Sequence, residues 1–97
     1  MSDFEWNPKK SLSNLEKHGI DFYTASMMWR GLVYEAETYP GNDEARFKAL
    51  GMIDGRHWTV IVTYRKGVRR IISARRSRKE EAELYDYVKG RKEAGDR

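Results

Sequence analysis

Four stretches rich in β-branched and aromatic residues follow one another in the middle of the chain, and turn signals separate them. The stretches cover residues 32–38, 45–53, 56–65 and 68–76. The separators are Pro40-Gly41-Asn42-Asp43, Asp54-Gly55 and Lys66-Gly67. An Asp-Gly pair in this setting is a strong signal for a two-residue hairpin. In the third stretch apolar residues alternate with Thr59 and Thr63, which is typical of a central strand. The pattern predicts a four-stranded antiparallel meander.

Helix signals flank the predicted strands. Asn7 can act as an N-cap with Pro8 at the first helical position, and Gly19 can end that helix in the left-handed conformation. We expect Leu12 and Leu15 to face the core from this helix. Before it, residues 4–6 form a possible short first strand.

Two further helices are expected. Asp21 can cap the second helix, which should end at Arg30-Gly31. Its apolar residues recur at helical spacing and are Phe22, Ala25, Met28 and Trp29. Ser77 and Glu80 fit a capping box at the start of the last helix, which should run through Val88. The apolar stripe of that helix is Leu84, Tyr85 and Val88.

These elements predict an α+β fold. It has an antiparallel four-stranded sheet, the possible N-terminal strand, two N-terminal helices and one C-terminal helix. The 97 residues suffice for one domain, which we place at residues 1–90. We expect residues 91–97 to fray as a C-terminal tail.

The charge is distributed unevenly along the chain. Residues 1–48 carry six Lys and Arg against eight Asp and Glu, whereas residues 49–97 carry thirteen against seven. Between Arg65 and Lys79 there are eight basic side chains and no acidic one. Such a segment generates a positive field that attracts a polyanion, and nucleic acid is the obvious candidate. Charge alone is equally compatible with a solvated cationic surface or an acidic protein partner.

Several classes of protein are excluded. The chain has no cysteine, no Gly-rich phosphate loop, no dinucleotide fingerprint and no Gly-x-Ser-x-Gly motif. His18 and His57 stand alone, and their spacing to the carboxylates matches no metal site, so we expect no metal and no cofactor. No apolar stretch is long enough to export the chain or to cross a bilayer, which predicts a cytoplasmic protein without membrane contact.

Chemistry could reside at the start of the second predicted strand. There Glu44, Arg46 and Lys48 project from one face, because side chains two apart share a face, and Phe47 points the other way. A base, cations and an acid are what RNA cleavage without a metal requires. The alternative is a solvent-facing charge ladder, and spacing alone favours that alternative.

The last predicted strand offers a second candidate. Alternation divides its four arginines into two faces, Arg69 with Arg75 and Arg70 with Arg76. Arg75 and Arg76 lie where the strand meets the start of the last helix, an end that attracts anions. We favour phosphate binding here over a structural ion pair with Glu80 or Glu81.

Four short motifs, taken in order, resemble the BrnT toxin family over nearly the full chain. They are residues 4–9 (FEWNPK), 14–20 (NLEKHGI), 44–47 with 49–51 (EARF and ALG) and 71–76 (IISARR). Asn7 stands where such sequences commonly have Asp, and Arg30-Gly31 replaces their usual Asp-Pro. The resemblance implies a RelE-like ribonuclease that cleaves RNA without a metal and arrests translation. It also implies a BrnA-like ribbon-helix-helix antitoxin, which forms a hetero-oligomer with the toxin and brings it to operator DNA.

The resemblance carries the family's motifs onto particular residues of this chain. They are Glu44, Arg46 and Phe47, then Lys17, His18 and Gly19, and finally the run from Ser73 to Arg76. In this interpretation Glu44 is the base, and Arg46 with Arg75 or Arg76 stabilises the phosphate. The candidates for the acid are Lys9 and His18. The competing hypothesis is a non-catalytic module that binds nucleic acid or a protein partner.

Overall fold

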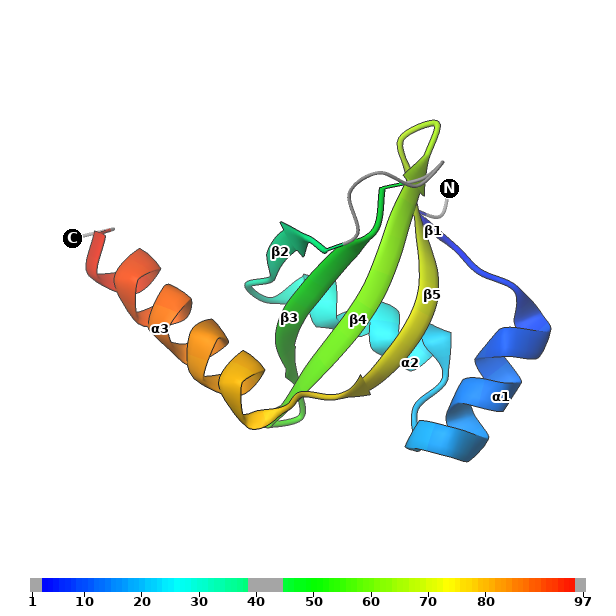
Figure 1. Ribbon diagram of the computed structural model, residues 1–97, viewed down its shortest axis with the longest axis horizontal. Helices are drawn as coiled ribbons and strands as arrows, with labels where there is room; N and C mark the ends of the chain where they lie inside the picture. The colour runs from blue at the N-terminus through cyan, green and yellow to red at the C-terminus, as the bar shows by residue number, and fades with distance from the viewer. Residues whose placement is uncertain (1–2, 39–44, 96–97) are drawn as a thin grey trace.

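The computed structural model describes residues 3–38 and 45–95, and these form an α+β fold (Figure 1). The elements in chain order are β1 (Phe4–Glu5), α1 (Pro8–His18), α2 (Phe22–Ser26), the 3₁₀ helix η1 (Met27–Arg30), β2 (Tyr34–Glu37), β3 (Phe47–Ile53), β4 (Arg56–Arg65), β5 (Val68–Arg76) and α3 (Lys79–Gly95). The predicted separator at residues 40–43 lies outside the described residues.

The predicted meander is confirmed, and it forms most of the sheet. Each of the strands β2 to β5 pairs antiparallel with the next one along the chain. The full strand order is β1-β5-β4-β3-β2, which makes β4 the central strand. The prediction of a wholly antiparallel sheet is wrong in one respect, because β1 adds to the edge of β5 in parallel. Parallel pairing needs a long connection between the two strands, and the chain from α1 to β4 supplies it.

The predicted caps begin and end the first two helices. The Asn7 side chain accepts a hydrogen bond from the Lys9 amide (2.9 Å), and Gly19 ends α1 at a φ of 76°. The Asp21 carboxylate accepts one from the Thr24 amide (2.8 Å). The second predicted helix is α-helical only as far as Ser26, and its last turn tightens into η1. Short local hydrogen bonds thus fix where the helices enter the fold.

The hydrophobic core lies between α2 with η1 and one face of the sheet, and α2 runs behind the strands in Figure 1. The core residues of the helices recur at the predicted helical spacing, and the strands contribute every second residue. The fully buried apolar members include Phe22, Ala25, Met28, Ala49, Val60, Val62 and Ala74. The main core cluster therefore occupies one face of the sheet, and the opposite face carries polar side chains together with buried Leu50 and half-buried Ile61.

The expectation that Leu12 and Leu15 face the core is wrong. These side chains are 64% and 44% exposed, whereas Asn14 between them is 7% exposed. The Asn14 amide donates to the carbonyl oxygens of Ile20 (2.8 Å) and Ala74 (2.9 Å) and accepts from the Ala74 amide (3.2 Å). α1 contacts the edge of β5. Backbone groups at this edge have no neighbouring strand to pair with, so a buried side chain there must offer hydrogen bonds, which Asn14 does and a leucine cannot.

A β-bulge in β5 changes which of its side chains share a face. Thr59 pairs with Arg75 and Thr63 with Arg70, but the register shifts by one residue between them and leaves Ile72 without a partner. An extra residue reverses the alternation. The predicted division of the arginines is therefore wrong: Arg70 shares a face with Arg75, and the two other arginines of the strand, Arg69 and Arg76, lie on the core face.

The last helix differs from its prediction at both ends. α3 begins at Lys79, and the carboxylate of Glu81 rather than Glu80 accepts the Arg78 amide (2.8 Å) as the capping group. The helix continues to Gly95, beyond the predicted end at Val88, and projects away from the sheet (Figure 1). Of the predicted stripe, Tyr85 is buried, Val88 is half-buried and Leu84 is exposed. In the described ranges no helix is long and apolar enough to cross a membrane.

The Asn14 clamp yields a stability prediction. Asn14→Ala should lower the free energy of unfolding by about 1–3 kcal/mol, because it leaves buried backbone groups of Ala74 and Ile20 without their partners. Leu12→Ala should change it by no more than about 0.5 kcal/mol, since that side chain is largely in water. Urea unfolding followed by circular dichroism measures both variants. A larger loss for Leu12→Ala than for Asn14→Ala would contradict the observed packing of α1.

Candidate nucleic-acid interface

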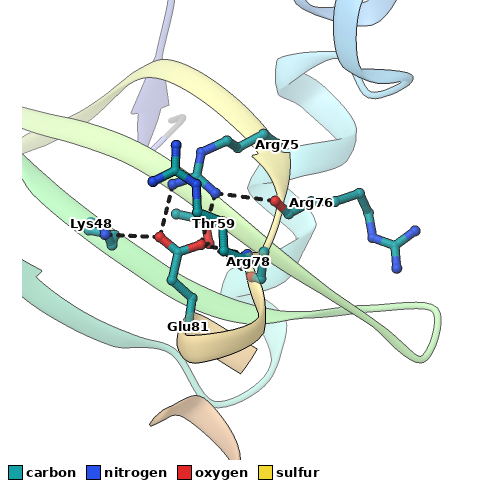
Figure 2. A network of polar contacts seen from close by, with 7 residues as sticks. Lys48, Thr59, Arg75, Arg76, Arg78 and Glu81 are labelled. Atoms are coloured by element: carbon teal, nitrogen blue, oxygen red, sulfur yellow. Dashed lines mark hydrogen bonds and ion pairs between the residues drawn. The ribbon is translucent and has the colours of Figure 1, made fainter. Parts of the chain in front are cut away.

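The sheet face opposite α2 carries polar side chains from the three central strands. We call it the open face; it consists of Lys48 on β3, Thr59 and Thr63 on β4, and Arg70, Ser73 and Arg75 on β5. α3 contacts β3 and β4 at one end of this face, and there Glu81 reaches Lys48 and Arg75 (Figure 2). The rest of the open face has no helix packed on it in the part of the chain that the structure describes.

A groove lies beside the open face, between α1 and β5. It consists of two adjoining cavities of about 140 and 380 Å³, which share Lys10 and Ile72. We call it the basic groove, because none of its lining residues is acidic and five are Lys or Arg. These five are Lys10, Lys17, Arg46, Arg65 and Arg70. Polar side chains of Ser13, His18 and Ser73 line the wider cavity.

Three of the five cations of the basic groove have no carboxylate partner among the described residues. Among residues 3–38 and 45–95, no carboxylate lies within ion-pair distance of Lys10, Lys17 or Arg46. Arg70 does form such a pair, with Glu5 at 2.8 Å. Like charges that are gathered without counter-charges produce a positive potential, which a polyanion relieves.

The Glu81 carboxylate forms an ion cluster at the α3 end of the open face (Figure 2). Both its oxygens accept hydrogen bonds from the Arg75 guanidinium, each at 2.8 Å. Lys48 Nζ lies 2.9 Å away, and the Thr59 hydroxyl donates at 3.0 Å. These hydrogen bonds, led by Arg75 and opposed by burial, hold the pKa of Glu81 far below its ordinary value. Glu81 therefore stays ionised, and it cannot accept a proton near neutral pH.

The structure places two of the predicted site residues on the basic groove, in different cavities. Arg46 lines its narrower cavity and His18 its wider one. Arg75 forms the ion pair with Glu81 that was the alternative to phosphate binding. Glu44 lies outside the described residues.

The remaining predicted site residues lie elsewhere. Arg76 is on the core face, with its guanidinium 5.5 Å from the centre of the Trp58 ring, and Figure 2 shows it directed away from the Glu81 cluster. Phe47 packs against the core and makes an edge-to-face contact with Tyr64. Lys9 is exposed on the first turn of α1 and does not line the basic groove.

Sequence reasoning missed three residues of this region. Lys10 lines both cavities, Arg70 was assigned to the wrong face, and Glu81 was considered only as a possible partner of Arg75. A signal existed for Glu81, since a Glu at the third helical position commonly returns to cap its own helix. No comparable signal marks the bulge that turns Arg70 to the open face.

A larger cavity of about 470 Å³ lies away from the open face, between the N-terminal strand and η1. Phe4, Tyr23 and Trp29 line it, together with Arg69. Arg69 is already engaged, because its guanidinium lies over the rings of Phe4 and Trp29 and near Glu35 (3.7 Å). We assign the candidate site to the basic groove although each of its two cavities is smaller, because it gathers three cations that have no carboxylate partner among the described residues.

Among the described residues, potential metal ligands do not gather at the site. Throughout the described ranges, no three His, Asp or Glu side chains lie close enough together to hold an ion.

A sequence model of a protein family, described as "Ribonuclease toxin, BrnT, of type II toxin-antitoxin system", matches residues 6–81. This range includes the basic groove, the open face and Glu81 at its last position. No curated protein matches the chain.

Glu81→Gln tests whether the ion cluster stabilises the fold through its charge. At neutral pH the substitution should lower the free energy of unfolding by roughly 1–3 kcal/mol, because it removes a charged acceptor from Arg75 and Lys48. The lowered pKa sets the sign of the pH dependence. The difference in the free energy of unfolding between wild type and Glu81→Gln should be complete above the unfolded-state pKa of a glutamate, about 4.3. It should shrink as the pH falls below that value.

Urea unfolding at several pH values between 7 and 2 measures this advantage. Glu80→Gln removes a neighbouring exposed carboxylate and is the matched control, which should follow the wild type. A difference between wild type and Glu81→Gln that stays constant down to pH 2 would rule out a charge-based contribution.

Proposed function

Since the chain belongs to the BrnT family of ribonuclease toxins of type II toxin–antitoxin systems, we propose that it cleaves RNA bound in the basic groove and across the open face. The observation that carries this proposal is the gathering of Lys10, Lys17 and Arg46 without carboxylate partners among the described residues. Such a surface binds a phosphate backbone, and the adjoining open face supplies further cations.

The proposed reaction is a transesterification within the RNA strand. The base removes the proton of a 2′-hydroxyl, whose oxygen attacks the neighbouring phosphorus, and the 5′-oxygen leaves with a proton from the acid. The products are a 2′,3′-cyclic phosphate and a 5′-hydroxyl. We assign Glu44 as the base on the sequence motif alone, Arg46 as the cation on the phosphate, and His18 as the acid.

Arg75 and Lys48 contribute positive charge to the same face as Arg46. Their pairing with Glu81 leaves the three groups with one net positive charge. Arg76 and Phe47 lie on the core face, so an RNA strand on the open face does not reach them. We infer that these two residues support the site through packing. Lys9 remains the alternative acid.

We further propose that the reaction needs no metal ion, since Arg and Lys side chains can stabilise the extra charge on the phosphate. The arrangement of a four-stranded meander with two N-terminal helices and one C-terminal helix supports a RelE-like classification. In this proposal the toxin acts in the cytoplasm and arrests translation. A BrnA-like ribbon-helix-helix antitoxin binds and neutralises it, and brings it to operator DNA.

An RNA cleavage assay tests the proposed activity. The purified protein should cleave single-stranded RNA in the presence of EDTA, and Arg46→Ala should slow cleavage by about 10²–10³-fold, because it removes a cation from the developing charge. Arg30→Ala is the matched control, since Arg30 is exposed on η1, at the cavity on the core side, and lines neither part of the basic groove. It should cleave at the wild-type rate.

Each failure of the assay has a distinct meaning. Intact RNA with the wild-type protein would overturn the proposal, and RNA that shifts in a salt-dependent way without being cut would support the non-catalytic module. Loss of cleavage in EDTA would overturn metal independence alone.

Co-expression tests the proposed partner. Expression of the chain alone should stop growth and translation, and co-expression with a ribbon-helix-helix protein from the neighbouring gene should restore both. The two proteins should co-purify, and only the complex should bind the operator. Growth arrest that persists despite co-purification would contradict neutralisation by this partner.

A further inference from the structure

Glu81 is surrounded by donors from three strands and from the start of its own helix. The Arg75 guanidinium comes from β5, the Lys48 ammonium from β3 and the Thr59 hydroxyl from β4. The Arg78 amide comes from the start of α3. One carboxylate on α3 thus sets the spacing between two cations on strands that are not neighbours in the sheet. Figure 2 shows the cations converging on it from opposite sides.

We propose that Glu81 is a positioning residue of the ribonuclease, which holds Lys48 and Arg75 on the open face in the geometry that receives the RNA phosphate. The proposal rests on the function proposed above. It assigns Glu81 no proton transfer, because its oxygens already accept five polar contacts and its charge is stabilised by them.

Both cations remain partly exposed, and Lys48 retains the capacity to bind a further anion. Lys48 has three donor protons and makes one ion pair to Glu81, and its side chain is 34% exposed. Arg75 remains 24% exposed, and besides Glu81 it donates a hydrogen bond to the Arg76 carbonyl oxygen (3.2 Å). Without Glu81, both long side chains would regain rotamer freedom, and their mutual repulsion would drive them apart. With Glu81 they are fixed at a net charge of +1.

Contacts between α3 and the sheet hold Glu81 in its position beside the cations. Tyr85, one turn further along, donates a hydrogen bond to the Leu32 carbonyl oxygen (2.9 Å), and Asp86 pairs with His57 on β4 (2.8 Å). These contacts dock the first two turns of α3 on the sheet. The position of the helix thereby determines the position of the cations, although α3 itself does not line the basic groove.

Glu81→Gln separates the positioning role of Glu81 from a purely electrostatic effect of its charge on RNA binding. Removal of a negative charge beside a polyanion site should tighten RNA binding or leave it unchanged, because repulsion falls. Loss of positioning should lower kcat by about 10- to 100-fold, as misplaced groups do. We therefore expect kcat and Kd to respond differently. Kd is measured with a 2′-deoxy analogue of the RNA, which lacks the attacking hydroxyl, and kcat with the RNA itself.

Glu80→Gln is the control for charge alone, because Glu80 is its exposed neighbour on the same helix turn. It should leave kcat at the wild-type value. Thr59→Val gives a second, milder perturbation that removes one donor to Glu81 and keeps every charge. It should lower kcat by a smaller factor than Glu81→Gln does, and it keeps the proposal testable should Glu81→Gln not fold.

The outcomes decide between positioning and a purely structural role. A folded Glu81→Gln protein with wild-type kcat, at a temperature well below its midpoint of unfolding, would overturn the proposal. Equal losses of kcat in Glu80→Gln and Glu81→Gln would overturn it as well. A double-mutant cycle with Lys48→Met should show a smaller effect of Glu81→Gln on kcat than in the wild type, and additive effects would exclude action through Lys48. A wild type that leaves RNA intact would overturn the proposed function instead.

Discussion

One extra residue in β5 decides which charges share a face of the sheet. Without the bulge at Ile72, Arg70 would lie on the core side and the open face would have fewer cations beside Arg75. With it, Arg70 lines the basic groove together with Arg46, while Arg69 takes the opposite face and lies over aromatic rings. The electrostatic difference between the two faces depends on this local change of register, since strand alternation transmits it to every residue on one side of the bulge.

Two polar residues then hold the helices against this sheet in positions that apolar packing would not specify. Asn14 completes the backbone hydrogen bonds at the edge of β5, and Glu81 joins α3 to the three central strands. Each is buried and fully bonded, so each has a directional requirement that an aliphatic side chain lacks. The same two contacts border the candidate site: Asn14 forms part of the basic groove, and Glu81 fixes the cations at the end of the open face.

The two faces of the sheet therefore serve different purposes. The core face carries Val60, Val62 and Ala74 against α2 and η1, and its arginines are satisfied by aromatic rings or by Glu35. The open face keeps cations at the surface, where Glu81 pairs with Lys48 and Arg75, and Glu5 pairs with Arg70. This separation lets a small domain combine one compact core with a binding surface for a polyanion, because the charges do not interrupt apolar packing.

Local signals predicted the elements, and long-range contacts decided the site. The caps at Asn7 and Asp21 and the alternation in β4 act within a few residues of chain, so the sequence alone determined the helices, the meander and the family. Whether Leu12 or Asn14 faces inward depends on the edge of β5, sixty residues away, and the pairing of Arg75 with Glu81 depends on how α3 docks. Only the tertiary structure decided these points, because burial and ion pairing are properties of neighbours in space.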